Sequence, residues 1–532
     1  MKRSVSRVWA LIIAFVMVMS FTLTGCAKEA ADEPQSGGDT QQGATATAAP
    51  AQEAATDAPA APEVEKPEKI TIMVDGTLVT KLNARDQFEA KWEELTGIDL
   101  EIIQPDHSAY YDVVGQTLAS GNWPDVILLG STYYAGYATE GVLWDMTQAW
   151  ENSDLKASGR VTDTALVDGL KVDGVLYGIA PTRGNGCVTY IKKKWLDNVG
   201  LAVPTNYAEY IAMLDAFTTG DPDGNGVNGD TFGVSSAGIV GPEAPWTNYL
   251  PEFYQDANPG FYKNASGQWV DGFTEPNFKS ALERLRDAYA KGYIDKEALT
   301  NATSNCRDKY YEDKFGVFTY WAGTWATNIK TNLEANGLDG ELIALPPIAE
   351  VGSYLERQAP TWCITSKAKN PEGIFKYFFE TMLDGGEVQK LWSYGVEGSH
   401  WSTKAETVVG KTYQEGEFHM LESLEKPGTQ YTKNHIDPML AIAGLNDDPG
   451  AKTIAPEARA SQDLFNTHSR LADLVPSNDA MSQYNGDLTT LKNEIVANVV
   501  VSGLSIDDEM KRFESEGGAE WSKAIVDALN TK

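Results

Sequence analysis

The chain has 532 residues, of which 42% are hydrophobic and 22% charged, and its formal net charge at pH 7 is −32. This composition is typical of a soluble globular protein, and the length predicts two or three domains. The excess of negative charge argues against nucleic acid and anionic lipid surfaces as partners.

Residues 1–25 have the pattern of a bacterial export signal. The basic start consists of Lys2, Arg3 and Arg7, and the apolar run that follows is shorter than the roughly 20 residues of a spanning helix. It ends in Leu23-Thr24-Gly25-Cys26, which resembles the lipobox of bacterial lipoproteins. The resemblance implies cleavage before Cys26 and acylation of that cysteine with palmitate. An ordinary secretory signal with an incidental cysteine is the alternative.

Residues 26–69 are predicted to form a disordered linker. The segment is rich in Ala, Thr, Gln, Pro, Gly and Glu, and Val64 is its only large aliphatic residue after Cys26. Such a composition cannot bury enough apolar surface to offset the entropy of ordering. We therefore expect a folded body held at the outer face of the cytoplasmic membrane through the lipid alone.

Residues 70–129 alternate between strand and helix patterns. Strand patterns cover 70–74, 100–103 and 126–129. The first helix pattern carries Phe88, Trp92 and Leu95, with Asn83 as its expected N-cap, and the second surrounds Val114. This order predicts a parallel sheet with right-handed crossovers.

The remaining chain holds several amphipathic helix patterns. Asn206-x-x-Glu209 forms a capping box before one of them, and Asn370-Pro371 opens another. The C-terminal region is predicted to be helical, including a helix capped by Ser505.

Six different short motifs follow one another along the chain. They occupy Gly121–Val126, Tyr133–Thr147, Lys194–Thr205, Asp221–Gly226, Gly316–Trp325 and Gly395–Trp401. In this order they resemble the extracellular solute-binding proteins of sugar ABC transporters, most of all the lipoprotein branch of Gram-positive bacteria. The resemblance covers most of Ile70 to Leu529.

The resemblance implies an α/β fold with two lobes, of the type II periplasmic-binding-protein kind. Each lobe would contain a mostly parallel sheet flanked by helices, with the ligand in the cleft between the lobes. By analogy the N-terminal lobe comprises 70–181 plus about 356–426, and the C-terminal lobe comprises 182–355 plus about 427–532. The crossing segments are expected near 180–185 and 346–355.

The resemblance also implies a monomeric binding protein that needs no cofactor and is not an enzyme. It would capture an oligosaccharide by hinge closure and deliver it to ABC permease subunits in the membrane. A surface-anchored carbohydrate-active enzyme, a hydrolase or a lyase, is the alternative. The sequence contains neither H-E-x-x-H nor G-x-S-x-G, and its 75 acidic residues make any pairing of carboxylates uninformative.

A segment rich in Asp, Asn and Gly has the oxygen spacing of an EF-hand-like calcium loop. Its expected ligands are Asp221, Asp223, Asn225, the Val227 carbonyl and Asp230. Phe232 occupies the position of the usual bidentate Glu, so the loop lacks the carboxylate ligand that normally closes such a site. A metal-free turn is the alternative to a structural Ca²⁺ site.

Aromatic residues at motif positions are candidates for stacking on sugar rings. By analogy the second lobe contributes Trp246, Trp321 and Trp325, and the first lobe contributes Tyr133 and Trp401. Residues that could hydrogen-bond the polar edges of a sugar are Arg183, Asp75, Asn185 and Glu397. For the tryptophans the alternative is a place in the core, and for the polar residues it is a salt bridge at the hinge or on the surface. Cys187, Cys306 and Cys363 are expected to be buried thiols.

Overall fold

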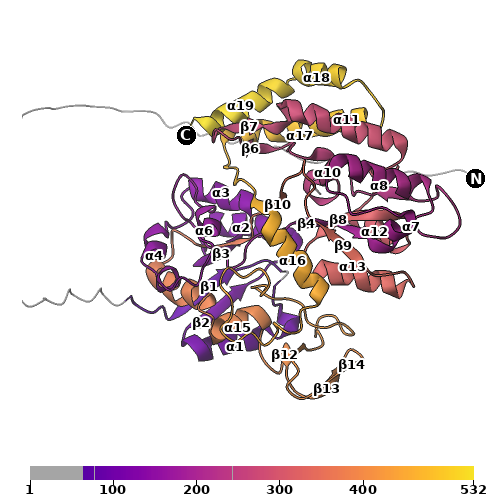
Figure 1. Cartoon of the computed structure of the whole chain (residues 1–532). Coiled ribbons are helices and arrows are strands. Elements are labelled where there is room, and N and C mark those ends of the chain that lie inside the picture. Colours follow the sequence, from indigo (N-terminus) through magenta and orange to yellow (C-terminus); the bar gives the residue numbers. More distant parts are fainter. Residues whose placement is uncertain (1–63, 77, 242–243, 532) are drawn as a thin grey trace, which may run out of the picture. The chain divides into compact units, whose positions relative to one another are not determined.

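The computed structural model of this chain describes residues 64–76, 78–241 and 244–531 (Figure 1). They belong to one compact unit, Glu63–Lys532. The predicted signal segment, Cys26 and nearly all of the predicted linker lie outside the described residues. Within the described ranges, no helix has both the length and the apolar character that crossing a membrane requires.

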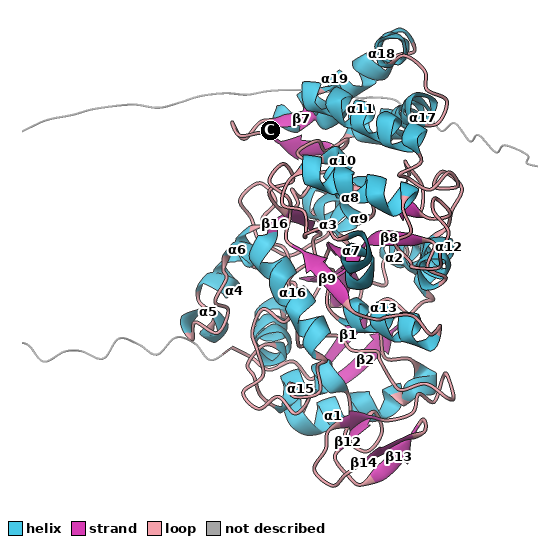
Figure 2. Cartoon of the chain, turned by 45° about the vertical axis from the view of Figure 1, so that its right-hand side comes forward, coloured by secondary structure: helices cyan, strands magenta, loops and turns pink. Residues whose placement is uncertain are grey.

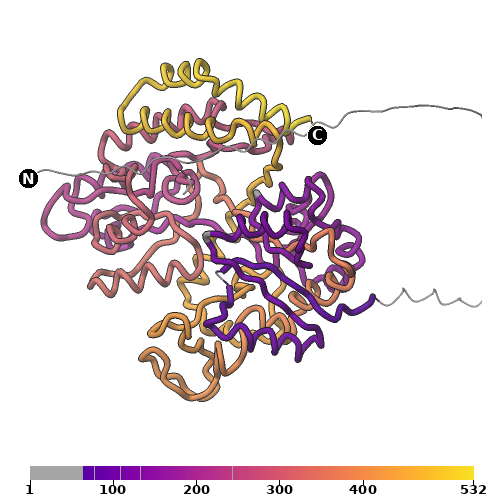
Figure 3. Tube along the Cα trace, turned by 180° about the vertical axis from the view of Figure 1, so that it is seen from behind, coloured from indigo at the N-terminus to yellow at the C-terminus, as the bar shows by residue number. Residues whose placement is uncertain are grey.

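The buried apolar residues form two large cores, each built from separate stretches of sequence. One core draws on residues 70–180, 359–392 and 436–443, and the other on residues 188–354 and 465–529. Figure 3 shows this interleaving, because the indigo and orange parts of the trace run together, as do the magenta and yellow parts. The fold therefore has two lobes, which we call lobe 1 and lobe 2 after these two cores.

The position of residues 436–443 differs from the sequence-based assignment, which gave them to the C-terminal lobe. Ile436, Ile442 and Ala443 pack in the core of lobe 1. The Ile436 N–H donates to the Trp392 carbonyl at 3.2 Å, and the Ile442 N–H donates to the Pro181 carbonyl at 3.0 Å. These bonds hold the segment against lobe 1.

The sheet of lobe 1 has the strand order β11-β3-β1-β2. Its strands are β1 (Lys69–Met73), β2 (Asp99–Ile103), β3 (Val126–Leu129) and β11 (Thr361–Ile364). β1 pairs in parallel with both β2 and β3, as the sequence predicted, and β11 joins β3 antiparallel. The surrounding helices are η1 (Lys81–Asn83), α1 (Arg85–Thr96), η2 (His107–Ala109), α2 (Tyr110–Ala119), α3 (Ser131–Thr139), α4 (Thr147–Glu151), α5 (Asp154–Ala157), α6 (Ala165–Asp168), α14 (Pro371–Ile374), η4 (Phe375–Glu380) and α15 (Glu387–Tyr394).

The sheet of lobe 2 has the order β5-β8-β4-β9 and corrects one expectation. Its strands are β4 (Cys187–Lys192), β5 (Phe232–Val234), β8 (Phe315–Trp321) and β9 (Leu342–Leu345). The prediction of a mostly parallel sheet is wrong here, because β4 pairs antiparallel with both β8 and β9 and only β5 and β8 are parallel. β4 begins at the edge of the sheet where the first crossing segment enters. β8 ends at that same edge, so the two strands run in opposite directions.

Helices flank this sheet and form a further layer beyond it. They are α7 (Lys193–Val199), α8 (Tyr207–Thr219), α9 (Pro245–Asn248), α10 (Pro251–Tyr254), η3 (Gly272–Thr274), α11 (Pro276–Lys291), α12 (Thr303–Tyr311), α13 (Thr324–Ala335), α16 (Pro456–His468), α17 (Asp479–Val500), α18 (Ile506–Ser515) and α19 (Gly518–Asn530). Figures 1 and 2 both show α11, α17, α18 and α19 gathered in one layer. The short strand pairs are β6 (Phe261–Lys263) with β7 (Trp269–Asp271), β12 (Trp401–Ser402) with β15 (His419–Met420), and β13 (Glu406–Val408) with β14 (Lys411–Tyr413).

A third segment lies alongside the two crossings that the sequence predicted, and we call it the third crossing. It is β16 (Ser469–Leu471), which pairs in parallel with β10 (Tyr354–Glu356) of the second crossing. The first crossing packs closely against the second at Gly184, where an added Cβ would lie 1.6 Å from the Arg357 carbonyl oxygen. Only glycine permits this approach of the two backbones.

Helix starts follow the predicted caps in part. The Asn206 side chain accepts the Glu209 N–H at 3.0 Å, and Asn370 accepts the Gly373 N–H at 3.0 Å. Asn83 does not cap α1. Ala84, at a φ of 58°, precedes that helix, and the Asn83 amide instead donates to Glu425 at 2.8 Å.

Candidate functional site

A cavity of about 250 Å³ opens at the carboxyl ends of the lobe 1 strands. It is lined by Asp75, which follows β1, by Gly130, which follows β3, and by Tyr111, Thr182 and Trp362, among others. In α/β sheets ligands bind at this edge, because the loops that leave the strand ends are free to present side chains. We call this cavity the strand-end pocket. The predicted site residue Asp75 lines it, and its carboxylate lies 2.7 Å from His107 Nδ1.

Two tyrosines stack beside the strand-end pocket. The ring centroids of Tyr111 and Tyr133 are 3.7 Å apart and the rings stack nearly parallel, at an interplanar angle of 2°. The Tyr111 hydroxyl accepts the Gly130 N–H at 2.8 Å, which ties the pair to the start of α3. Tyr133 remains 42% exposed, so this pair offers a flat apolar face to a ligand. The sequence predicted Tyr133 and missed Tyr111, although the Tyr110-Tyr111 repeat at the start of α2 was a usable signal.

The same pocket includes His435 and Asp437, which sequence reasoning also missed. His435 packs against Trp392, with ring centroids 4.6 Å apart, and burial lowers the pKa of His435 to about 3. Burial raises the pKa of Asp437 above its ordinary value. His435 is therefore a neutral group at ordinary pH. These residues are far from Asp75 in sequence, and only the fold brings them together.

The predicted tryptophans of the β8–α13 region each lie beside an arginine. The Arg357 guanidinium carbon is 4.7 Å from the Trp321 ring centre, and the same side chain donates to Asn248 Oδ1 at 2.6 Å. Trp325 stands perpendicular to the Tyr320 ring at 4.8 Å, with Arg307 at 5.3 Å. Trp321 and Trp325 are both half-buried, so each keeps part of its ring accessible.

Arg183 and Asn185 lie in the first crossing segment. Arg183 Nη2 forms an ion pair with the buried Glu356 of the second crossing, and Ser469 of the third crossing donates to the same carboxylate oxygen at 3.3 Å. This arrangement corresponds to the hinge salt bridge that the sequence left open as the alternative. The Asn185 carbonyl accepts the Arg357 N–H at 3.1 Å, and its side-chain oxygen accepts the Gly186 N–H at 2.9 Å.

Trp401 and Glu397 do not line the strand-end pocket. Trp401 is 8% exposed in a small cluster with Tyr394 and Phe418, and its indole N–H donates to the Gly395 carbonyl at 3.0 Å. Glu397 is exposed and, with Trp401, lines a different cavity beside α1 and α15. These contacts correspond to the structural alternative for Trp401.

Trp246 lines a cavity of about 350 Å³ that lies within lobe 2. Its half-buried ring is 6.4 Å from that of Tyr254.

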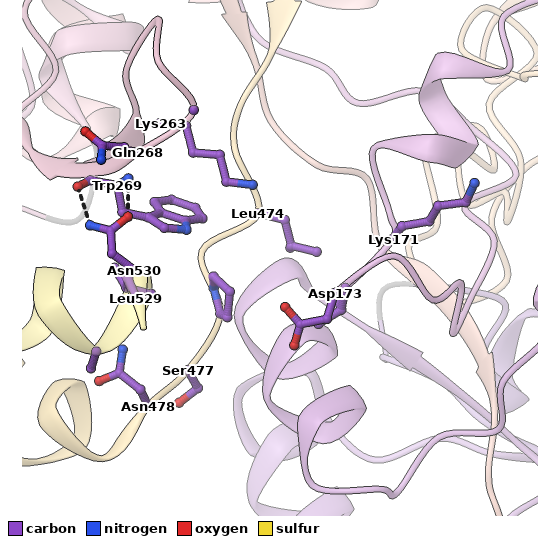
Figure 4. A pocket seen from close by; sticks show the side chains of 14 residues that line it. Lys171, Asp173, Lys263, Gln268, Trp269, Leu474, Ser477, Asn478, Leu529 and Asn530 are labelled. Atoms are coloured by element: carbon purple, nitrogen blue, oxygen red, sulfur yellow. Dashed lines mark hydrogen bonds between the residues drawn. The ribbon is translucent and has the colours of Figure 1, made fainter. Parts of the chain in front are cut away.

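A further cavity of about 380 Å³, shown in Figure 4, has walls from both lobes: Asp173 reaches toward it from lobe 1, and Lys263 from lobe 2. In that cavity the Asn530 side-chain amide accepts the Trp269 N–H and donates to the Trp269 carbonyl, each at 2.9 Å.

The predicted calcium loop brings its side chains together. The Asn225 amide nitrogen lies 2.8 Å from both Asp223 Oδ2 and Asp230 Oδ2, and Asp221 Oδ2 accepts the Gly226 N–H at 3.0 Å. Burial raises the pKa of Asp223, and the carboxylates of Asp221 and Asp230 raise it further. Oδ1 of Asp221 is buried with no hydrogen-bond partner among the described residues. An oxygen-rich, negatively charged set of this kind suits a hard cation.

The side chains of this loop are not arranged as a ready-made metal site. Among the described residues, no group of three or more His, Cys, Asp or Glu side chains is arranged to hold a metal ion. The Asn225 amide occupies the space between the carboxylates. Because the oxygen and nitrogen of an amide exchange places by a half-turn of the side chain, cation binding would require that turn. The three predicted thiols, Cys187, Cys306 and Cys363, are buried, and no disulfide joins them to one another.

Sequence comparison supplies relatives of this chain. It is 27% identical over 328 residues to the lipoprotein LipO of Bacillus subtilis, a match that covers 59% of this chain and 63% of LipO. It is 21% identical over 463 residues to the polygalacturonan/rhamnogalacturonan-binding protein YtcQ of the same species, covering 82% of this chain and 86% of YtcQ.

Solved structures share the fold at low identity. A solute-binding protein of Bifidobacterium longum infantis, associated with an ABC transporter and described as binding HMO, superposes with a TM-score of 0.60 at 17% identity and covers 88% of this chain and 100% of its own. The substrate-binding protein FusA of S. pneumoniae, in complex with kestose, gives a TM-score of 0.55 at 18% identity, with coverage of 87% and 98%. The type II binding-protein fold predicted from the sequence is confirmed.

Residues 79–383 match the family model described as "Bacterial extracellular solute-binding protein". This match spans more than half of the chain, and two of the relatives, YtcQ and FusA, are named as binding proteins. The chain therefore belongs to the bacterial extracellular solute-binding proteins.

Proposed function

We propose that this protein captures an oligosaccharide outside the cell and delivers it to the permease of an ABC importer. The observation that carries the proposal is the exposed Tyr133 face, stacked on Tyr111 beside a polar pocket at the strand ends of lobe 1. Sugars present C–H faces to flat rings and hydroxyl edges to a few fixed polar groups. Two of the relatives, YtcQ and FusA, are named for binding polysaccharide or oligosaccharide.

The proposed ligand site has walls from both lobes. We assign Tyr133 and Asp75 to its lobe 1 wall and Trp321 and Trp325 to its lobe 2 wall, whereas Trp246 lines a separate cavity within lobe 2. A ligand that contacts both lobes stabilises their closed arrangement, since it gains contacts there that the open state lacks. Arg183 and Asn185 lie in the crossing segments, and we assign them to the hinge rather than to direct sugar contact.

Calorimetry with a panel of neutral and acidic oligosaccharides tests the proposal, together with small-angle scattering on the same mixtures. We expect one of these two classes of oligosaccharide to bind and to reduce the radius of gyration of the protein. Binding without compaction would contradict hinge closure, and chromatography that shows new products would favour the enzyme alternative.

The finer assignments are proposals as well. We propose that Cys26 carries the lipid and that the mature chain is a monomer. Palmitate labelling that tags Cys26→Ala as strongly as the wild type would contradict lipidation. We also propose that the loop of Asp221, Asp223, Asn225, Val227 and Asp230 binds a structural Ca²⁺ ion.

A further inference from the structure

The cavity beside Trp246 differs in chemistry from the other cavities described above. Its apolar wall is formed by Val240, Trp246, Tyr254, Phe261, Phe273, Phe278 and Val496. Among the described residues that line it, Lys492 alone is charged, and Lys492 Nζ is bound to Asp271 Oδ1 at 2.7 Å. The strand-end pocket and the cavity of Figure 4 each contain at least two charged lining residues. We call this cavity the α17 pocket, and in a chain of net charge −32 its described lining is close to neutral.

One side of the α17 pocket is polar. Asn485, Thr489 and Asn493 all line it, and their spacing of four residues places them on one face of α17. Within the described ranges, none of these three side chains makes a hydrogen bond, and neither does the Trp246 indole N–H. Asn485 and Thr489 are exposed, and Asn493 is half-buried. Ready donors and acceptors thus face a wall of aromatic rings.

This asymmetry limits the ligand chemistry. An anionic group would lose its hydration without gaining a free cation, because the Lys492 ammonium is already neutralised by Asp271. An unsubstituted hexose ring carries hydroxyls around most of its edge, whereas the pocket offers partners along one side only. A group with one polar edge and an apolar remainder matches both walls. An acetamido group has an N–H donor and a carbonyl acceptor beside a methyl group, and an asparagine amide offers the complementary acceptor and donor.

We propose that the α17 pocket recognises an N-acetylhexosamine residue, with the acetamido group on Asn485 and Asn493 and the methyl group and ring face against Trp246 and Phe261. The proposal rests on the proposed function insofar as that residue belongs to the transported oligosaccharide. It assigns substrate-specificity roles to residues of α17, none of which the sequence indicated as candidate site residues. The pocket volume of about 350 Å³ is at the lower end of ligand pockets and suits one substituted ring.

The test uses two probes that differ only in the acetamido group. Methyl N-acetyl-β-glucosaminide and methyl β-glucoside are titrated into the full-length protein, and binding is followed by ligand-observed NMR and by Trp fluorescence. We expect the acetamido probe to bind at least tenfold more tightly, because it adds hydrogen bonds to Asn485 and Asn493 and a methyl contact with the rings, all of which the glucoside lacks. Equal affinities, or no saturable binding of the acetamido probe, would overturn the proposal.

Variants of α17 locate the binding site. Asn485→Ala combined with Asn493→Ala should weaken binding of the acetamido probe at least tenfold and leave the glucoside unchanged. Gln483→Ala removes an exposed amide from the same helix outside the pocket and is the matched control. If the control and the double variant behave alike, the pocket is not the site. Trp246→Ala removes the ring that the sugar face is proposed to contact and should weaken binding of the acetamido probe. Where that variant fails to fold, Trp246→Phe, which keeps an aromatic ring, should still bind the probe.

The outcomes separate this inference from the proposed function. If oligosaccharides bind and compact the protein without any preference for acetamido sugars, only the inference fails. If the acetamido probe binds in the α17 pocket and no oligosaccharide compacts the protein, the proposed function fails and the pocket assignment stands.

Discussion

The ion pair between Arg183 and Glu356 should be a main determinant of how firmly the crossing segments are joined. Glu356 comes from the second crossing, Arg183 from the first, and Ser469, from the third, donates to the same carboxylate oxygen. The Glu356 side chain is 2% exposed and that of Arg183 is 19% exposed. Removing one partner of a buried pair costs about 3–5 kcal/mol, because the other charge is left without compensation.

The difference in burial predicts an asymmetry between the two single substitutions. Arg183→Leu leaves a carboxylate that water cannot reach, so it should lower the free energy of unfolding by about 3–5 kcal/mol. Glu356→Leu leaves a guanidinium that can regain part of its hydration, so its cost should be smaller, about 1–3 kcal/mol. The double substitution should cost less than the sum, since it leaves no unpaired charge.

Differential scanning calorimetry on the four proteins measures these differences, and scattering shows whether the lobes keep their arrangement. Ser469→Ala removes only the hydroxyl and is the conservative control. If the two single effects add within about 0.5 kcal/mol in the double variant, the pair does not couple the crossings and this reasoning is refuted.

Three further predictions concern the core, the cleft and the loop. Burial raises the pKa of Glu252 to about 7 from 4.5, so the folded state holds a proton that the unfolded chain releases. Stability should therefore fall by about 3 kcal/mol as the pH rises from about 4 to about 8, through the unfolded and then the folded pKa, and Glu252→Gln should flatten that slope in thermal melts. Trp321→Ala should weaken oligosaccharide binding at least tenfold by calorimetry and hardly change the melting temperature, whereas Trp195→Ala in the core should cost about 3–5 kcal/mol. The opposite result would place Trp321 in the core. A chelator should lower the melting temperature of the wild type, which at a hundredfold excess of Ca²⁺ over Kd gains about 2.7 kcal/mol, and should not affect Asp223→Ala. An equal effect on both would exclude this loop.

Local sequence patterns predicted the elements that local forces determine. The parallel pairing of β1 with β2 and β3 follows from the strand–helix alternation at 70–129, and the helix starts at Asn206 and Asn370 follow from short-range capping. The helix that Asn370-Pro371 opens continues as a π-helical segment, Phe375–Glu380, which the pattern did not indicate. The expected Asn83 cap is wrong because a partner more than three hundred residues away, Glu425, binds that side chain.

The candidate site was harder to predict because it depends on long-range contacts. Tyr133 and Trp321 lie in motifs and could be selected from them, whereas His435 and Asp437 reach the strand-end pocket only because residues 436–443 return to lobe 1. Asn485, Thr489 and Asn493 lie on a helix whose apolar stripe gives no sign of a ligand. Their significance emerges only when α17 packs across from Trp246.

The positions of the two aromatic surfaces suggest a division of labour between the lobes. Tyr133 stacks on Tyr111 and is exposed, so lobe 1 offers an open platform on which sugars of many kinds can stack. The α17 pocket of lobe 2 is enclosed by rings on one side and polar on the other, which restricts its ligand to one kind of substituent. For a ligand that engages both surfaces, the closed state is stabilised only as far as the ligand also fits lobe 2. Specificity for the sugar should accordingly change with substitutions in lobe 2, and affinity for sugars in general with substitutions at Tyr111 and Tyr133.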